Sequence, residues 1–199
     1  ASINGIEEAD LIFLIGTNPR YEATILNARI RKSHLNNNTK ILSLNDNGDL
    51  TYPYESLDGN TQTLKNIFEG TNDLSKIISD SKKPMIILGE SFLRLNSAEF
   101  LYEKMLEFLK LNNKFYEYWN PINILSCDAA TVGNFDLGLI NNENNLLNNL
   151  KSNKFDIVYL VGQDNLDFVK KDEFVIYQGS HGDKGAEIAD IILPGSAYT

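Results

Sequence analysis

The chain has 199 residues, a net charge of −9 and a hydrophobic content of 42%, which is ordinary for a globular protein. The acidic balance argues against nucleic-acid binding, which depends on clustered Lys and Arg, and against an anionic membrane surface. No apolar run approaches the ~20 residues that cross a bilayer, and no signal peptide is visible. Because the chain begins without Met, we expect a fragment, a processed product or one piece of a split subunit.

Cysteine and histidine, which commonly bind metals, are scarce in the sequence. Cys127 is the single cysteine, so an internal disulfide and a Cys-ligated iron–sulfur cluster built from this chain alone are both excluded. The two histidines, His34 and His181, lie far apart in the sequence, which argues against a structural zinc site.

The first predicted element is a strand over residues 9–16, a nearly continuous apolar run that ends in Gly16. Such a run is typical of a central parallel strand that is buried on both faces. Asn18 then suits a helix N-cap and Pro19 the first helical position. We therefore expect a strand, a tight turn and a helix.

That helix is predicted over residues 19–33, with Tyr21, Ile25 and Ala28 sharing one face. Ser97 is expected to cap a helix with an apolar stripe of Leu101, Met105, Phe108 and Leu109. Asn120 and Pro121 repeat the cap pattern and predict a helix to about residue 131, which Gly133 would end. Shorter helices are predicted at 62–68, at 74–79 and within 141–149.

Further strands are predicted at residues 40–44, 84–88, 155–162, 173–178 and 189–194. The alternation favours an α/β fold with a mostly parallel sheet, or sheets, and helices on both faces in Rossmann-like layers. The pattern leaves open a division into two lobes, near residues 80–84 or in the Asn-rich run 141–149.

The turn of residues 15–19 is one candidate ligand site, because anions favour helix N-termini at the carboxyl ends of strands. A phosphate or a pterin pyrophosphate would suit it, but one glycine is weak evidence beside a full dinucleotide fingerprint, so a packed turn is favoured. Gly89 and Gly162 end later strands in the same way, which indicates a feature of the fold more than three binding sites.

The Gly-rich loop 179–185 is the second candidate, and within it His181 and Asp183 carry acid–base chemistry in principle. No Ser, Cys or Lys partner is placed beside them, so a structural loop is favoured. Cys127 is expected inside a helix as a small buried hydrophobe. The aromatic run 115–119 fits core packing or a subunit interface better than cofactor stacking.

Several segments together resemble the C-terminal region of the largest iron–sulfur subunit of respiratory complex I. The most specific are ADLIFLIGTNPRYEA near the start and QGSHGDKGA with ADIILPGSAYT at the end. In family order, the matching segments are residues 9–23, 26–32, 49–55, 84–89, 123–125, 136–138, 178–186 and 189–199.

The resemblance implies a molybdopterin-oxidoreductase-like fold over residues 1–199, here as a fragment. In the molybdenum enzymes of that superfamily a Gly-x-Asn-Pro turn holds a pterin dinucleotide, whereas the complex I subunit keeps the fold without it. Residues 45–48 read Asn-Asp-Asn-Gly, not the Asp-Pro-Arg usual in cofactor-binding relatives. The resemblance also implies that iron–sulfur ligands belong to an N-terminal part of the subunit or to a partner chain.

We therefore expect a scaffold domain of the peripheral arm of NADH:ubiquinone oxidoreductase, with other peripheral-arm subunits as partners. No residue is expected to be catalytic, to bind a cofactor or to hold a metal. The alternatives are a molybdopterin-binding oxidoreductase fragment and a nucleotide-binding α/β module. The expected location is the matrix side of the mitochondrial inner membrane, with the cytoplasmic face of a bacterial inner membrane as the alternative.

Overall fold

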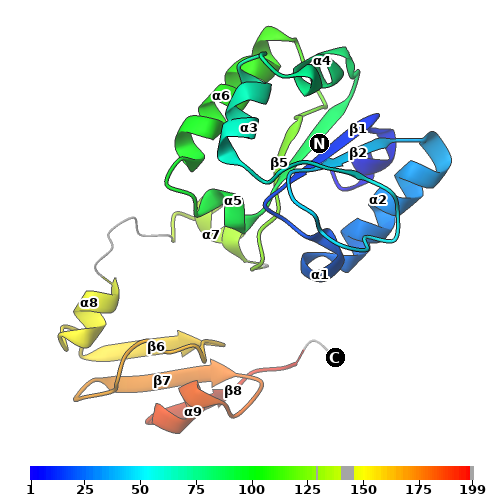
Figure 1. The fold of residues 1–199 in the computed structure, drawn as a ribbon. Coiled ribbons are helices and arrows are strands. Elements are labelled where there is room, and N and C mark those ends of the chain that lie inside the picture. Colours follow the sequence, from blue (N-terminus) through cyan, green and yellow to red (C-terminus); the bar gives the residue numbers. More distant parts are fainter. Residues whose placement is uncertain (129, 140–145, 198–199) are drawn as a thin grey trace. The chain divides into compact units, whose positions relative to one another are not determined.

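A computed structural model describes residues 1–128, 130–139 and 146–197, which form two compact units, Ala1–Val132 and Gly133–Thr199 (Figure 1). The lobe boundary considered near residues 80–84 is wrong, because strands on either side of it are neighbours in one sheet. The alternative boundary, in residues 141–149, falls largely on residues 140–145, outside the described ones.

The first unit contains a five-stranded sheet in the order β3-β2-β1-β4-β5, and every neighbouring pair is parallel. The strands are β1 (Leu11–Ile15), β2 (Lys40–Ser43), β3 (Glu55–Ser56), β4 (Pro84–Leu88) and β5 (Ile122–Ile124). All five residues of β1 and of β4 are buried, as their unbroken apolar sequences predict. The sequence pattern did not predict the short edge strand β3.

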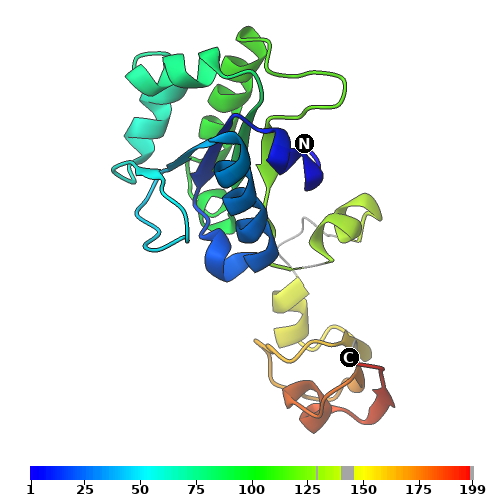
Figure 2. The same ribbon diagram turned by 90° about the vertical axis from the view of Figure 1, so that its right-hand side faces the viewer.

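Helices cover both faces of this sheet, so the α/β layering is confirmed (Figures 1 and 2). Phe13 and Ile15 of β1 point to a core shared with α3 (Thr61–Phe68), α4 (Asp73–Asp80) and α6 (Ala98–Leu111). Ile12 and Leu14 point to the opposite core with α2 (Thr24–Asn37) and the 3₁₀ helix η1 (Asn4–Glu8). This alternation is the period of two that strands impose on their side chains.

The helix predicted over residues 19–33 is two helices, α1 (Pro19–Glu22) and α2, which meet at Ala23. The predicted apolar face is on the wrong side, since Tyr21 is 80% exposed and Ile25 is 75% exposed. The buried positions of α2 are Asn27, Ile30 and Ser33. Asn27 is there because its amide donates to a loop carbonyl and accepts from the Tyr52 hydroxyl.

Helices α3, α4 and α6 lie where the sequence predicts, and the stripe expected on α6 is buried. Ser97 precedes α6 but its side chain accepts no capping hydrogen bond. In α3 and α4 the N-caps are Asn60 and Asn72, and the side chain of each accepts a hydrogen bond from the backbone N–H two residues later. A short helix, α5 (Glu90–Leu93), follows β4 and was not predicted.

The helix predicted from Pro121 is wrong, because β5 occupies this position and pairs with β4. The side chain of Asn120 does accept the backbone N–H of Ile122, as an N-cap would, but the chain continues extended. Cys127 therefore lies outside any helix and is exposed. Gly133 lies inside α7 (Thr131–Asp136) instead of ending a helix.

Two charged groups support the strand ends opposite the β1–α1 turn. The carboxylate of Asp10 accepts three hydrogen bonds, from the hydroxyl of Ser81 and the backbone N–H groups of Lys82 and Lys83. Burial opposes ionisation, but these bonds outweigh it and lower the pKa of Asp10. The buried ammonium of Lys114 donates at 2.6 Å to two carbonyl oxygens at the end of α4, one of them that of Ser81.

The second unit contains a parallel sheet in the order β6-β7-β8, with strands β6 (Ile157–Val161), β7 (Phe174–Gly179) and β8 (Ile191–Pro194). The three predicted strands are thus confirmed, with shorter bounds for β6 and β8 and with β7 shifted by one residue. Its helices are α8 (Leu146–Lys151) and α9 (Lys184–Ile188). Leu160, Val175 and Tyr177 form its core, and Ala186 of α9 packs against them.

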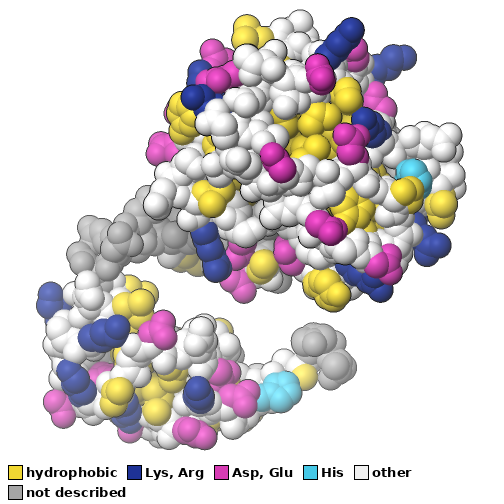
Figure 3. Space-filling model, in the orientation of Figure 1, with side chains coloured by type: hydrophobic (Ala, Val, Ile, Leu, Met, Phe, Trp, Pro, Cys, Tyr) yellow, Lys and Arg dark blue, Asp and Glu magenta, His cyan; other side chains and the backbone are white. Residues whose placement is uncertain are grey.

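Charged side chains of both signs are scattered over the face seen in Figure 3, with hydrophobic groups between them. Within the described ranges, no helix combines the length and the apolar character needed to cross a membrane.

Candidate functional site

The junction between β1 and α1 lies at the carboxyl end of a central strand, where α/β proteins place ligands. Gly16 ends β1 with φ +65°, and a Cβ there would lie 2.6 Å from the backbone nitrogen of Phe92. A Cβ on Gly89 would collide with the carbonyl oxygen of Gly16 and lie 2.6 Å from the Cβ of Thr17. These two glycines let the turns that follow the parallel strands β1 and β4 pack in direct contact.

Gly162 ends β6 with φ +59° and nothing lies within 4 Å of its absent Cβ. The three strand-end glycines therefore have different physical causes: a close approach at Gly89, a positive φ at Gly162, and both at Gly16.

The β1–α1 turn has the predicted cap, since the side-chain oxygen of Asn18 accepts the backbone N–H of Arg20 and Pro19 takes the first helical position. Glu22 accepts from two further donors of the turn. Its carboxylate accepts the backbone N–H of Asn18 at 2.9 Å and the hydroxyl of Thr17 at 2.6 Å. A carboxylate of the same chain thus takes the donors that a phosphate oxygen would use.

The loop after β2 closes the other side of the turn. The amide of Asn47 donates to the carbonyl of Thr17 and to the hydroxyl of Ser43, both at 3.0 Å. The amide of Asn18 in turn donates to the carbonyl of Asn47 at 3.1 Å. These reciprocal bonds tie the two loops together and use both N–H donors of the Asn47 side-chain amide.

The same loop is braced internally. The hydroxyl of Tyr54 donates to the Asp46 carboxylate at 2.7 Å, and the backbone N–H of Gly48 donates to the same oxygen at 2.9 Å. The Tyr54 hydroxyl and then the Gly48 N–H lower the pKa of Asp46.

The space left at the turn is small and polar, a cavity of about 160 Å³ between Gly16, Asn18, Asn47 and Ser91. Ligand pockets are typically about 300–1,000 Å³, so a dinucleotide does not fit there. No Lys or Arg is among the described residues that line the cavity, so none of them neutralises a phosphate there. The residues present therefore do not suit a phosphate or a pterin pyrophosphate.

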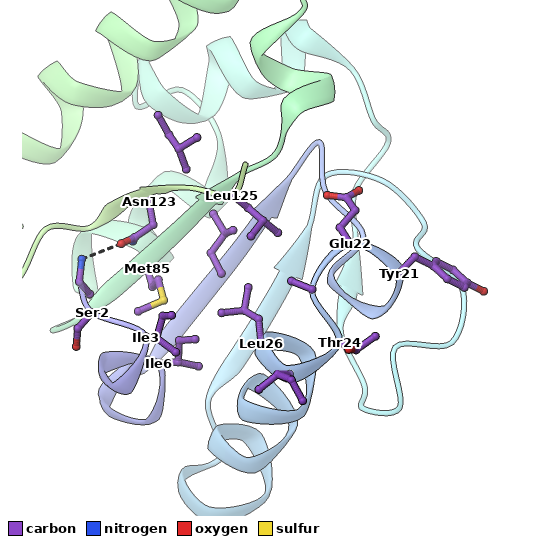
Figure 4. Close-up of a pocket in the computed structure, with 15 residues that line it drawn as sticks. Ser2, Ile3, Ile6, Tyr21, Glu22, Thr24, Leu26, Met85, Asn123 and Leu125 are labelled. Carbon is purple, nitrogen blue, oxygen red and sulfur yellow. Dashed lines mark hydrogen bonds between the residues drawn. The ribbon is translucent and has the colours of Figure 1, made fainter. Parts of the chain in front are cut away.

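A larger cavity, about 570 Å³, lies beside the turn and reaches the N-terminal segment (Figure 4). Its walls are mostly apolar and include Ile6, Leu26, Met85 and Leu125. No Lys or Arg is among the described residues that line it. This arrangement suits apolar side chains better than an anionic cofactor.

The second predicted candidate, the loop 179–185, packs around a tyrosine. A Cβ on Gly185 would lie 2.5 Å from the Tyr177 ring, and one on Gly179 would lie 2.6 Å from its Cζ. The Tyr177 hydroxyl donates to the Asp164 carboxylate at 3.0 Å, which also accepts the backbone N–H of Gly185 at 2.9 Å. The glycines thus make room for a buried ring.

His181 and Asp183 belong to the same loop, but the described contacts give them no shared partner. The ring of His181 hydrogen-bonds to the hydroxyl of its neighbour Ser180. His181 and Asp183 are both exposed. The backbone N–H of Cys127 donates to the Glu90 carboxylate. Desolvation and then the charge of Glu90 raise the pKa of the Cys127 thiol, the opposite of what a nucleophile needs.

A search of the described residues finds no group of three or more His, Cys, Asp or Glu arranged to hold a metal ion. Glu22 and Asn47 are the site residues that the sequence pattern missed. An acid in the first turn after the Asn18 cap was a usable signal, because carboxylates there reach back to free N–H groups. Asn47 had no local signal, since its role depends on the loop after β2 folding over β1.

Comparison with known proteins identifies the fold family. The family model of molybdopterin oxidoreductases matches residues 1–199. The chain is 42% identical, over 98% of its length, to the NADH-ubiquinone oxidoreductase 75 kDa subunit of Reclinomonas americana. It is 39% identical over its full length to the mitochondrial 78 kDa subunit of that enzyme in Candida albicans.

It is also 38% identical over its full length to the mitochondrial NADH dehydrogenase [ubiquinone] iron-sulfur protein 1 of Solanum tuberosum. The chain spans 26–28% of the length of these relatives. The resemblance found in the sequence motifs is thereby confirmed, and the chain belongs to the molybdopterin oxidoreductase family.

Proposed function

We propose that this chain is a structural domain of the peripheral arm of NADH:ubiquinone oxidoreductase, complex I. The proposal is supported by three relatives of about 40% identity, each of which is named as the 75 or 78 kDa subunit of NADH-ubiquinone oxidoreductase. The domain braces the cluster-bearing part of the subunit and offers surface to neighbouring subunits. It thereby supports electron transfer from NADH to quinone, coupled to proton translocation, without carrying electrons itself.

The observation that carries the structural role is the Glu22 carboxylate. It accepts the Asn18 N–H and the Thr17 hydroxyl, the donors with which this turn would hold a phosphate. Because the donors are already paired inside the chain, binding an external anion would first require breaking two hydrogen bonds and displacing a like charge. The fold is kept while its ligand turn is closed by the chain itself.

This role needs no catalytic, cofactor-binding or metal-binding residue in the chain. The iron–sulfur clusters belong to the N-terminal part of the subunit or to a partner chain, and the partners are other peripheral-arm subunits. Nucleic acid is not among them, since the net charge of −9 opposes phosphate binding. The matrix side of the mitochondrial inner membrane is the proposed location, supported by three relatives named mitochondrial, and a bacterial cytoplasmic face is the alternative.

Locating the chain in the assembled complex tests this role. Cryo-electron microscopy of complex I purified from the source organism should place the chain in the peripheral arm, in contact with a cluster-bearing polypeptide. Density for the complete arm without this chain, or the chain purifying apart from every arm subunit, would refute the assignment.

A molybdopterin-binding oxidoreductase fragment is the second candidate, favoured by the family match. Molybdenum, tungsten and pterin analysis separates it from the scaffold role. A nucleotide-binding module at the Asn18 turn is tested by thermal shift with NAD and ATP. A ligand at 100-fold its dissociation constant would stabilise the chain by about 2.7 kcal/mol.

A further inference from the structure

A third cavity, about 420 Å³, lies at the opposite end of the strands from the β1–α1 turn. Lys83 and Glu8 line it just before β4 and β1, and the loop between α6 and β5 contributes Tyr116, Glu117, Tyr118 and Trp119. In Figure 2 this loop projects beside the N-terminal segment. The aromatic run that the sequence singled out thus lines a cavity at the surface.

The loop is held in shape by the chain. Tyr116 and Trp119 exchange two backbone hydrogen bonds of 3.1 Å, and the indole N–H of Trp119 donates to the carbonyl of Pro84 at 3.0 Å. The Tyr116 hydroxyl donates to the carbonyl of Lys82 at 3.1 Å. A surface that is already ordered loses little entropy when a partner binds.

The cavity already binds one cation. The ammonium of Lys83 lies 5.3 Å from the centroid of the Trp119 ring and 2.6 Å from the Glu8 carboxylate. An aromatic face with a carboxylate beside it is the arrangement that attracts cationic side chains. Lys83 thus satisfies one such pair.

A second pair is left open. Glu117 is exposed and has no ion pair with any other described residue. The flanking rings of Tyr116 and Tyr118 are exposed, the latter by 88%. Lys114, the cation nearest to Glu117 in the sequence, donates to the carbonyls of Ser79 and Ser81 instead, and neither it nor Lys82 is among the described residues that line the cavity. The open part of the cavity therefore combines aromatic faces with an unpaired negative charge.

We propose that this cavity is a docking site for an arginine side chain of a neighbouring polypeptide. The guanidinium stacks on the tyrosine rings while it pairs with the Glu117 carboxylate. Arginine suits the site better than lysine because its planar group stacks on rings and bonds carboxylates in a bidentate way. Tyr and Arg are also the residues that most often dominate binding at protein interfaces.

Trp119 is the single tryptophan of the chain, so its fluorescence reports on this cavity. The full chain is titrated with a short acetylated peptide carrying two arginines, and with the same peptide in which neutral citrulline replaces arginine. We expect a saturable change in fluorescence with the arginine peptide only. Glu117→Gln and Tyr118→Ala should each weaken binding about tenfold or more, as expected for an interface anchor.

Two matched variants serve as controls, Glu99→Gln for loss of an exposed carboxylate and Tyr21→Ala for loss of an exposed tyrosine. Both should bind the arginine peptide as the unaltered chain does. Equal binding of the citrulline peptide, unchanged binding by the two cavity variants, or no saturable change up to about 10 mM peptide would overturn the proposal. Each of these outcomes leaves the scaffold role to its own test.

Discussion

Gly89→Ala is the substitution that most directly perturbs the close contact between the turns that follow β1 and β4 at the candidate site. The new methyl group would collide with the carbonyl oxygen of Gly16 and lie 2.6 Å from the Cβ of Thr17, whereas ordinary contacts begin at 3.4 Å. Both obstacles belong to or adjoin the backbone, so the two segments must separate by roughly 1 Å. Overpacking costs about 1–3 kcal/mol, and an obstacle that cannot rotate away places this case near 3 kcal/mol.

Gly48→Ala is the matched control, since Gly48 has φ +66° and nothing lies within 4 Å of its absent Cβ. It should cost only the strain of a positive φ, about 1 kcal/mol. Urea unfolding followed by Trp119 fluorescence gives both values, because the single tryptophan lies in the first unit. If Gly89→Ala destabilises the unit no more than Gly48→Ala does, the close contact between Gly89 and the segment of Gly16 and Thr17 is refuted.

Three further predictions concern side chains. Asp10→Asn should cost about 2 kcal/mol near neutral pH, because the charged acceptor of three hydrogen bonds is lost. The folded pKa of Asp10 lies below its ordinary 3.8, so the Asp10 carboxylate contributes its full stabilisation above pH 3.8 and loses it as the pH falls through the folded pKa. The urea midpoints of the variant and the unaltered chain should therefore converge in acid. Lys114→Met should cost about 2 kcal/mol in the same assay, since two carbonyls lose a buried donor; no loss would show that the ammonium is dispensable. Iodoacetamide should alkylate Cys127 in the native chain at a rate still rising near its ordinary pKa of 9.0, and complete protection of the thiol would contradict its exposure.

The central strands β1 and β4 were predictable because their cause is local, whereas β3 and β5 were not predicted. Residues 11–15 and 84–88 are apolar without interruption, and an apolar run of this length is typical of a strand that is buried on both faces. The stripe on α6 was predictable for the same reason, since a period of 3.6 places four apolar residues on one side.

The errors arose where tertiary contacts override local pattern. Ile25 is exposed because α2 turns the side with Asn27 and Ile30 toward the core, where Asn27 hydrogen-bonds with the loop after β2, and Tyr21 lies on the separate helix α1. The Asn120–Pro121 pair has the bonding of a helix cap, yet pairing with β4 decides for a strand. Sequence order alone carries neither fact.

The candidate site was half predictable. Asn18 and Pro19 act as their residue types imply, and Gly179 and Gly185 make room for the Tyr177 ring. The closure of the turn by Glu22 and Asn47 depends on two loops meeting, which only the folded chain determines.

Whether the chain carries a redox centre decides between a closed scaffold and a working oxidoreductase. Elemental analysis for molybdenum and tungsten, with pterin fluorescence after extraction, measures this directly on the purified polypeptide. A turn whose donors are held by its own carboxylate predicts substoichiometric traces of all three. One equivalent of metal or pterin per chain would contradict the account.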